Sequence, residues 1–427
     1  MLTVLPILTL LVVLVMGAPI YICLLAAGVA YFVMNPDVGT FVVPQLMNAG
    51  IMKYTFLAIP FFIMSGNCMN STGITKRLMK FSEVVAGKLP GGLAHVNIIL
   101  STLMGGLSGS NIADAVSDCK MLVPEMEQRG FGKAYSAAVT AASSLITPII
   151  PPGIGMVLYA FIANVSVGKM FMAGIVPGML MMAWEMAANH FVSKRRGYAP
   201  ARDRWPTARE VLHEGRSAFL SFLFPIIIIV GIRMGVFTST EAGAVAVAYA
   251  LLLGTLLFRE TKLSDVWRAL VDTALSTCTS IMIFASANVF AWFVTNEKLS
   301  DSLAALALRC VATSTGFLII FVLIVLVMGM FLDGTTMMII LVPLFLPTAT
   351  SFGIDPIFFG IIFLLCSAVG NITPPVGVVM YTVCDVIGVK VKDFTRECLP
   401  FYLVLVLNIL LLIAFPRIVT FLPDLLF

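Results

Sequence analysis

Two proline-rich interruptions, each inside a long apolar segment, constrain this chain more than any other feature. The first is 146-ITPIIPPG-153 and the second is 370-GNITPPVG-377. A helix cannot continue through such a run, because proline lacks an N–H donor and its ring clashes with the preceding turn. In a bilayer, the freed backbone groups are tolerated only where they are buried in protein or line a cavity. Matched interruptions in the two halves of a membrane protein therefore indicate the binding site of a transporter.

The composition indicates that this chain resides in a lipid bilayer. Hydrophobic residues make up 60% of the 427 residues and charged residues 11%, and the mean hydropathy is +1.04. Soluble domains carry about 25% charged residues, so this is not an ordinary soluble protein. Apolar runs near the ~20 residues that cross a bilayer recur from Leu2 to Leu422. The first run has no basic segment and no evident cleavage site, so we expect a membrane helix there and not a removed signal peptide.

Several function classes find no support in the sequence. There is no phosphate-binding loop of the G-x-x-x-x-G-K-[ST] type, so nothing indicates ATP hydrolysis by this chain. The eight cysteines are scattered without a C-x-x-C pair, and the three histidines lack the spacing of metal ligands. We expect the cysteines to serve as packing residues. No catalytic pair or metal set indicates an enzyme.

The basic residues identify the cytoplasmic loops. Of the 26 Lys and Arg residues, 20 fall in five short clusters, at 76–88, 120–133, 194–216, 259–268 and 390–396. By the positive-inside rule, these clusters face the cytoplasm. The longest, 194–216, contains two prolines and is the expected linker between the two halves. The net charge of +4 reflects this loop bias, so we expect no nucleic-acid partner.

Basic clusters on both sides of residues 91–119 predict a re-entrant hairpin. A single crossing by this apolar segment would place one cluster outside, whereas a hairpin that enters and leaves by the cytoplasmic face satisfies both. We expect its tip at 105–111, because this stretch is rich in glycine, serine and asparagine. A broken helix at about 133–165 follows. The other elements expected in this half are helices at about 2–17, 19–35 and 53–70, an amphipathic interfacial helix within 71–90, and a crossing at about 171–193.

The second half repeats this order in the opposite orientation. Gly92 and Gly105 recur with the same spacing as Gly316 and Gly329, and the other corresponding landmarks keep a nearly constant offset along the chain. A run at 314–349 has a polar centre at 333–336 and is flanked by outer loops, whereas cytoplasmic charges flank the first hairpin. We therefore predict an all-α polytopic membrane protein with two inverted-topology repeats. Each repeat holds a re-entrant helical hairpin and a broken transmembrane helix, as in many secondary transporters.

This arrangement predicts five segments, of which two form a moving transport domain and three form a scaffold. They are N-terminal scaffold helices with an amphipathic arm at 1–90, a first transport repeat at 91–166, central scaffold helices at 167–313, a second transport repeat at 314–389, and a cytoplasmic arm with a C-terminal helix at 390–427. Within the central segment we expect helices at about 217–235 and 239–258, followed by one more crossing that ends near Asn296.

The hairpin tips and helix breaks expose polar groups suited to binding ions. Carbonyl groups at a helix C-terminus attract a cation, and N–H groups at an N-terminus attract an anion. Neutral side-chain oxygens join them, from Ser108, Ser110, Asn111 and Thr147 in the first half and from Thr335, Thr336, Asn371 and Thr373 in the second. Such oxygens suit Na+. Hydroxyl groups in membrane helices also bond back to their own backbone, so each of them has a structural alternative.

Several acidic residues lie near these segments, and each has two interpretations. Asp333 either coordinates a cation or caps the second half-helix of its hairpin. Asp114 and Asp118 either act as N-terminal charges on the return helix or line a wet entry. Glu241 fits a capping box with Thr238. A proton-coupled transporter or exporter of similar architecture, in which Asp333 or Asp385 titrates, is the alternative to cation coupling. Matched inverted hairpins disfavour a channel.

The sequence resembles the large membrane subunit of tripartite ATP-independent periplasmic (TRAP) transporters. The similarity spans most of the chain, in the family's order, at 59-IPFF-62, 107-LSGS-110, 149-IIPP-152, 171-FMAGIVPG-178, 237-FTSTEAGA-244, 353-GIDP-356 and 373-TPPVG-377. One departure is the polar run 111–114 after the Ser-Gly-Ser motif. The resemblance implies an elevator-type solute:sodium symporter, with multiple spans of the bacterial inner membrane, that takes up organic acids such as sialic acids, C4-dicarboxylates or keto acids. It also implies a small four-helix membrane subunit and a periplasmic binding protein as partners.

The resemblance also implies where two or more coupling Na+ ions and the solute bind. Sodium site 1 is expected at Ser108, Gly109, Ser110, Asn111, Thr147, Pro148, Pro151 and Gly153. Sodium site 2 is expected at Gly329, Asp333, Gly334, Thr335, Gly370, Asn371, Thr373 and Val376. Solute contacts are expected from Ser108, Asn111, Pro152, Thr335, Thr336 and Pro375. No organic cofactor is expected.

Overall fold

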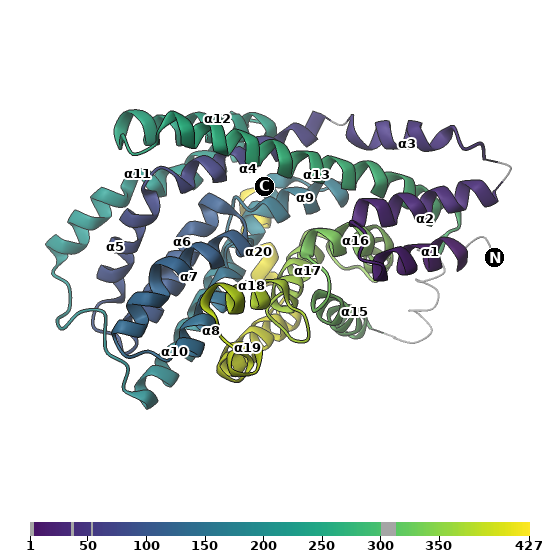
Figure 1. Ribbon diagram of the computed structural model, residues 1–427. Helices are drawn as coiled ribbons and strands as arrows, with labels where there is room; N and C mark the ends of the chain where they lie inside the picture. The colour runs from purple at the N-terminus through teal and green to yellow at the C-terminus, as the bar shows by residue number, and fades with distance from the viewer. Residues whose placement is uncertain (1–3, 36–37, 53, 300–312) are drawn as a thin grey trace.

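The computed structural model describes residues 4–35, 38–52, 54–299 and 313–427, and this part of the chain is helical without strands (Figure 1). Six of its helices are long and apolar enough to cross a bilayer. They are α10 (Val167–Arg196), α11 (Ala208–Arg233), α12 (Ser239–Leu251) with its π-helical continuation to Leu257, α13 (Leu263–Asn296), α16 (Gly334–Ser351) and α19 (Val391–Ala414). The predicted all-α polytopic membrane class is confirmed. Residues 300–312, which close the expected central segment, lie outside the described residues.

The first repeat consists of a hairpin and a broken helix. The hairpin is α6 (Gly92–Ser108) and α7 (Asn111–Gln128), and the broken helix is α8 (Lys133–Ser144) and α9 (Ile154–Ile162). The predicted tip at 105–111 was too wide, because α6 continues through Gly105 and Gly106 and the turn is confined to Gly109 and Ser110. The return helix also continues well beyond the expected end at 119. Its charged last turns made the apolar segment look shorter than the helix.

The second repeat has the same parts in the same order. Its hairpin is α15 (Ser314–Gly329) and α16, and its broken helix is α17 (Pro356–Gly370) and α18 (Val378–Ile387). Each break contains two adjacent prolines joined by a cis peptide bond, Pro151–Pro152 and Pro374–Pro375. Each proline pair lies between the two arms of its broken helix, so the pairs occupy equivalent positions in the two repeats, as the sequence predicts.

The two repeats exchange contacts across the centre of the molecule. Within each repeat, the first hairpin helix packs against the first arm of the broken helix: α6 against α8, and α15 against α17. Between repeats, each return helix packs against the short second arm of the other repeat: α7 against α18, and α16 against α9. This reciprocity is the inverted-repeat arrangement that the sequence predicts, and it brings both tips and both breaks toward one place.

The remaining helices surround this core. In the N-terminal part they are α1 (Val4–Val15), α2 (Ile20–Met34), α3 (Val42–Ile51), a 3₁₀ turn η1 (Tyr54–Leu57), α4 (Ala58–Asn70) and α5 (Ile74–Ala86), and the chain ends in α20 (Arg417–Leu426). The 34-residue α13 packs along α2, α3 and α4 (Figure 1). The sequence analysis missed α3, which is short and lacks a long apolar run. The amphipathic α5 packs its apolar face against α6 and α11.

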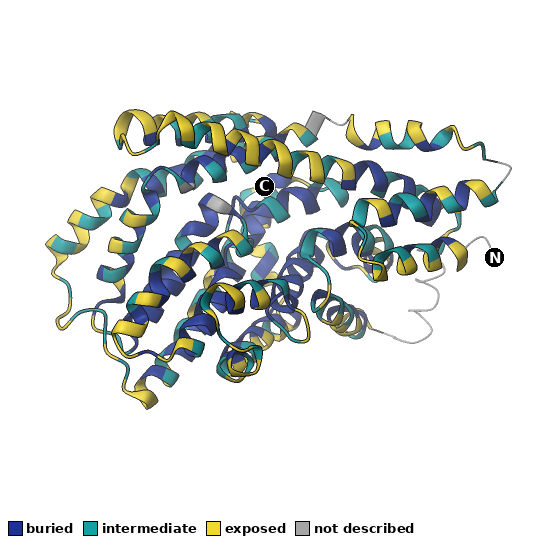
Figure 2. Ribbon diagram, viewed as in Figure 1, coloured by how far each residue is buried: buried dark blue, intermediate teal, exposed yellow. Residues whose placement is uncertain are grey.

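Burial is greatest where the broken helices enter the core. Every residue of α8 from Tyr135 to Ser144 is buried, and so is every residue of α17 from Ile357 to Gly370. In contrast, α11, α12 and α13 carry many exposed residues along their outer faces (Figure 2). The first arms of the two broken helices, α8 and α17, therefore form the centre of the buried core. Both lead directly into a proline-rich break inside protein.

The second hairpin meets the second break through two glycines. The end of α15 lies against the end of α17, and a Cβ atom added to Gly370 would stand 2.6 Å from the Cα atom of Gly329. Such a distance is far inside van der Waals contact, so the backbones can approach this closely only because neither residue has a side chain. This contact positions the second tip beside the second break.

We predict that Gly370→Ala destabilises the protein, although alanine favours a helix over glycine by about 1 kcal/mol. Overpacking against the Gly329 backbone should cost about 1–3 kcal/mol. Thermal unfolding in detergent measures the effect. Gly215→Ala is the control, because Gly215 is also helical and its added Cβ atom would make only an ordinary 3.6 Å contact. Equal melting temperatures for wild type and Gly370→Ala would contradict the close approach.

Candidate functional site

Both hairpin tips and both helix breaks line one cavity of about 230 Å³. The first tip contributes Gly109, Ser110 and Asn111, and the second contributes Asp333, Gly334 and Thr335. The cavity wall is completed by Ile112, Pro148, Ile154, Gly155, Leu158, Met338, Leu364, Ser367, Ala368 and Asn371. Segments from the two halves of the chain therefore share one site.

The first tip presents the N-terminus of α7 to the cavity. Gly109 makes the turn with φ +63°. Ser110 caps the helix, and its hydroxyl accepts a hydrogen bond from the Ala113 N–H at 3.4 Å. The Asn111 Oδ1 atom accepts from the Ile112 N–H at 3.0 Å. The N-terminus of a helix carries a partial positive charge, so this tip suits an anion.

The second tip is closed by Asp333, which caps α16. Its Oδ2 atom accepts hydrogen bonds from the N–H groups of Thr335 at 3.0 Å and Thr336 at 3.1 Å, and its Oδ1 atom accepts from the Thr336 hydroxyl. The capping role that the sequence left open is thus present. The three hydrogen bonds use both lone pairs of Oδ2 and one of Oδ1, so Oδ1 keeps one lone pair with which the same group can face a cation in the cavity.

The first break is buried and held by the first hairpin. The hydroxyl of Thr147, which is fully buried, donates to the Ser101 carbonyl at 3.4 Å. Gly105 and Gly106 of α6 press closely against the carbonyl groups of Thr147 and Pro151. The two glycines that the sequence assigned to the tip therefore allow α6 to approach the break.

The second break is held by the second hairpin and by α19. The Gly377 N–H donates to the Met330 carbonyl at 2.8 Å, and the Tyr402 hydroxyl donates to the Ile372 carbonyl at 2.6 Å. The Thr373 hydroxyl donates to the Val369 carbonyl at 2.7 Å, which is the back-bonding expected of a threonine in a membrane helix. Thr373 therefore turns its proton away from the cavity.

Asn371 is the one residue of the second break that both lines the cavity and has an unused polar atom. Its side chain is 5% exposed, and its Oδ1 atom has no hydrogen-bond partner among the described residues. Its backbone carbonyl accepts from the N–H groups of Val379 and Met380. A buried amide oxygen without a donor costs free energy, so Asn371 carries a vacant acceptor suited to a bound cation or a hydroxyl group.

The structure brings together only some of the sequence-predicted site residues. Those that line the cavity are Gly109, Ser110, Asn111, Pro148, Asp333, Gly334, Thr335 and Asn371. Those that do not line it are Thr147, Pro151, Pro152, Gly153, Gly329, Thr336, Gly370, Thr373, Pro375 and Val376. Pro375 and Val376 are exposed. Ser108 ends α6, and its side chain lies outside the described residues.

The cavity also has an apolar wall that sequence reasoning missed. It includes Leu158, Met338 and Leu364, which belong to apolar runs without any distinguishing motif. Ser367 is the one polar residue missed, and it lies one helical turn before Asn371. That spacing on one helix face was the only signal that could have identified it.

The other residues singled out in the sequence lie away from the cavity. Asp114 and Asp118 are each 2% exposed, so neither lines a wet entry in this conformation. Asp385 is exposed near the end of α18. The capping box of Thr238 and Glu241 is confirmed. The described cysteines are all free, and all but Cys278 are buried.

The electrostatics of the cavity come from the backbone and not from basic side chains. No Lys or Arg is among the residues that line it. The N-termini of α7, α9 and α16 face it instead, and each carries a partial positive charge. An anion placed here would meet helix termini, hydroxyl groups and amide groups, together with the carboxylate of Asp333.

Comparison with known proteins identifies the family. The family model of the tripartite ATP-independent periplasmic transporter, DctM component, matches residues 7–418. The chain belongs to this family. It is a multi-pass inner-membrane component of a secondary transporter, not an enzyme, and works with a small membrane subunit and a periplasmic substrate-binding protein.

Two relatives support this family assignment, and one solved structure shares the fold. It is 35% identical to the sialic acid TRAP transporter large permease protein SiaM of Vibrio cholerae, over 96% of this chain and 95% of that protein. It is 35% identical to the 2,3-diketo-L-gulonate TRAP transporter large permease protein YiaN of Escherichia coli, over 96% and 94%. The crystal structure of the Alcanivorax borkumensis YdaH transporter has the same fold, with a TM-score of 0.70, 13% identity, and coverage of 96% of this chain and 98% of that chain.

We predict that Asp333→Ala lowers the free energy of unfolding by about 1 kcal/mol, because α16 of this TRAP permease loses its N-cap. Asp355 provides the matched control. It caps α17 through the N–H groups of Ile357 and Phe358, at 2.8 and 2.9 Å, outside the cavity. Asp355→Ala should cost a similar amount in the same denaturation series. A loss in Asp355→Ala without any loss in Asp333→Ala would contradict the capping geometry.

Proposed function

We propose that this chain imports an organic acid, delivered by a periplasmic binding protein, in symport with Na+ through an elevator motion. The observation that carries the proposal is the cavity shared by two hairpin tips and two helix breaks, with an unpartnered amide oxygen of Asn371 in its wall. Backbone irregularity at membrane depth is costly, and secondary transporters use it to build ion and solute sites.

The cations would bind where the breaks expose oxygen atoms. Around Gly377, the carbonyl oxygens of Asn371 and Thr373 come so close that an added Cβ atom would lie 3.0 and 2.9 Å from them. The Thr373 carbonyl oxygen, Asn371 Oδ1 and Asp333 would form the second site, because the Asn371 carbonyl oxygen already accepts two backbone N–H groups. The first site would use the tip from Ser108 to Asn111 and the break from Thr147 to Gly153. Neutral oxygens with at most one carboxylate suit a monovalent hard cation.

The solute would be a carboxylate held between the two cation sites. Helix N-termini and bound Na+ would balance its charge, because no basic side chain lines the cavity. The relatives support an organic acid, since one is named as a sialic acid transporter protein and the other as a 2,3-diketo-L-gulonate transporter protein. A C4-dicarboxylate fits the same chemistry. Of the residues expected to contact solute, Asn111 and Thr335 line the cavity and would provide its hydrogen bonds.

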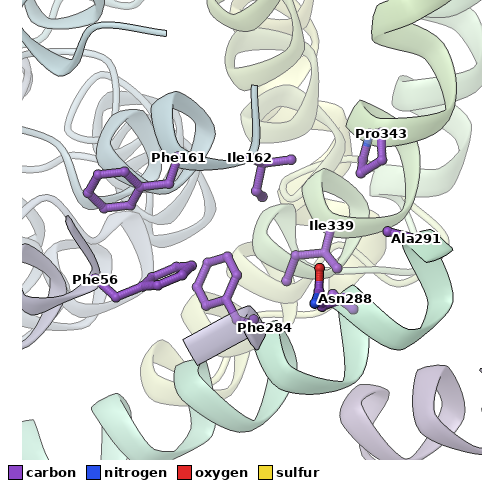
Figure 3. Close-up of a pocket in the computed structure, with 10 residues that line it drawn as sticks. Phe56, Phe161, Ile162, Phe284, Asn288, Ala291, Ile339 and Pro343 are labelled. Carbon is purple, nitrogen blue, oxygen red and sulfur yellow. The ribbon is translucent and has the colours of Figure 1, made fainter. Parts of the chain in front are cut away.

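The two repeats would move together against the surrounding helices. A second cavity, of about 180 Å³, lies where α9 and α16 of the repeats meet η1, α3 and α13 (Figure 3). Its wall is apolar except for Asn288, whose Nδ2 atom already donates to the Leu46 carbonyl at 2.6 Å. The rings of Phe56 and Phe284 are 4.6 Å apart between centroids at its edge (Figure 3). An apolar, incompletely filled contact of this kind would let the repeats slide against the surrounding helices.

Coupling would arise because ions organise the tips before the solute binds. If Na+ and solute favour the same arrangement of the tips, each raises the affinity of the other by linkage. The membrane potential adds about 2.3 kcal/mol per 100 mV for each net charge that crosses. The small membrane subunit, expected to have four helices, would support the scaffold.

We predict that the melting temperature of the purified protein rises in NaCl relative to KCl and choline chloride at equal ionic strength, because Na+ stabilises the folded state that binds it. Asn371→Ala and Asn111→Ala should each reduce this rise. Asn67→Ala is the control, since its side chain bonds Thr273 in the scaffold, outside the cavity.

Two results would contradict Na+ coupling at this site. One is equal melting temperatures in the three salts. The other is an Na+-specific rise that both asparagine variants retain in full. A pH-dependent melting shift that disappears in Asp333→Asn, without any cation specificity, would favour proton coupling instead.

A further inference from the structure

A cluster of buried oxygen atoms lies inside the first repeat, away from the residues that line the cavity. It joins Asp118 of α7, Asn97 and Ser101 of α6, and Thr140 and Ser143 of α8, and we call it the α6–α8 oxygen cluster. Four of these residues have no exposed surface, and Asp118 is 2% exposed. None of them belongs to the sites expected from the sequence.

The oxygens of this cluster lie within hydrogen-bond distance of one another. Ser101 Oγ is 3.2 Å from Asp118 Oδ2 and 3.1 Å from Ser143 Oγ. Ser143 Oγ is also 3.1 Å from Asn97 Oδ1 and 3.1 Å from the Thr140 carbonyl oxygen. The Asn97 amide nitrogen points away from these oxygens and donates to the Thr140 hydroxyl at 2.6 Å. The Thr140 hydroxyl donates in turn to the Ser136 carbonyl.

The cluster has fewer protons than contacts. Its four oxygen–oxygen contacts involve a carboxylate oxygen, an amide oxygen and a carbonyl oxygen, all of which only accept hydrogen bonds. The two serine hydroxyls supply one proton each. With Asp118 ionised and the Asn97 amide oxygen facing Ser143, two of these four contacts between oxygen atoms have no proton, which is unfavourable in a buried site. A bound cation would convert these contacts into a coordination shell.

The buried negative charge of Asp118 also favours a bound cation. Asp118 takes part in none of the ion pairs that the described residues form, and the hydrogen-bond donor it has among them is Ser101. A carboxylate buried at membrane depth is costly unless a counter-charge accompanies it. One carboxylate among neutral oxygens balances a monovalent cation, whereas divalent ions favour sites with more carboxylates or bound water.

The second repeat shows that this position does not need polar residues to fold. The repeats can be aligned on the glycines of the first hairpin helices, the N-caps of the return helices and the two proline pairs. Asn97 and Thr140 then correspond to Phe321 and Phe363, whose rings are in contact at 6.4 Å between centroids. The other cluster members correspond to Val325, Leu341 and Cys366, which are all buried. The same helices thus pack in one repeat through apolar side chains and in the other through an oxygen cluster.

We propose that the α6–α8 oxygen cluster binds a Na+ ion, in addition to the ions at the tips and breaks. Asp118, Ser101, Ser143 and Asn97 would provide its side-chain ligands, and Thr140 a backbone ligand. The Ser101 carbonyl also accepts the Thr147 hydroxyl, which connects the cluster to the first break. Binding here would stiffen the first hairpin against α8. This inference rests on the proposed Na+ coupling and extends it by one ion.

The test counts the ions bound to the purified full-length protein by equilibrium dialysis against ²²Na+. We expect Asp118→Asn to bind one Na+ fewer than the wild type. Ser143→Ala should weaken that ion by about tenfold or more. Ser144→Ala is the matched control, because Ser144 is the next residue of α8, is equally buried, and bonds only the Ala141 carbonyl. It should bind the full number of ions.

The variants also separate this inference from the sites at the tips. If Asp118→Asn and Ser143→Ala bind as many ions as the wild type, with unchanged affinity, while Asn371→Ala loses one, the cluster is not a Na+ site and a proton balances Asp118. If Asp118→Asn loses an ion while Asn371→Ala and Asn111→Ala do not, the cluster stands and the proposed tip sites fail. An equal loss in Ser144→Ala would overturn the assignment to this cluster.

Discussion

The structure depends on finding hydrogen-bond partners for backbone groups inside the membrane. Two proline-rich breaks leave these N–H and C=O groups without partners in a helix. Each break follows a helix that is buried over most of its length, and each is held by the hairpin of its own repeat: Thr147 bonds the Ser101 carbonyl, and the Gly377 N–H bonds the Met330 carbonyl. Close approach to the breaks requires glycines on the hairpins, at Gly105 and Gly329. A hairpin and a break therefore pack as one structural unit, in which protein surrounds the irregular backbone that lipid would not tolerate.

The exchange of contacts between repeats turns two such units into one site. Each return helix packs against the second arm of the other repeat, so the tips and breaks converge on a single cavity. The two repeats have the same arrangement of helices but differ in the side chains buried between them. The second is packed with aromatic rings such as Phe321 and Phe363, and the first holds the α6–α8 oxygen cluster. Symmetry thus accounts for the architecture of the site, and the α6–α8 oxygen cluster, which breaks the symmetry, is the reason for proposing a further ion in the first repeat.

Much of the fold could be predicted from the sequence, because proline and charge act locally. The prolines located both breaks, and the basic clusters around 91–119 required a hairpin. The extent of that hairpin was misjudged, because Gly105 and Gly106 suggested a turn although their role is to let α6 approach the first break. The helix α3 was missed, since its ten residues include polar and small residues and give no apolar run. The candidate site was less predictable, because side-chain direction depends on tertiary packing. Asn371 lines the cavity and has an unpartnered side-chain oxygen, whereas the hydroxyl of Thr373, which looks alike in the sequence, bonds the Val369 carbonyl of the preceding helix.

The most direct test of the central claim is an electron cryo-microscopy structure of the complex with its organic acid, determined in NaCl and again in KCl. The account predicts solute density in the cavity between Asn111 and Thr335 in NaCl, with ion density beside Asn371. It predicts that both weaken or vanish in KCl. Solute density at another place in the molecule, or equal density in the two salts, would contradict the claim that the tips and breaks form a Na+-dependent binding site.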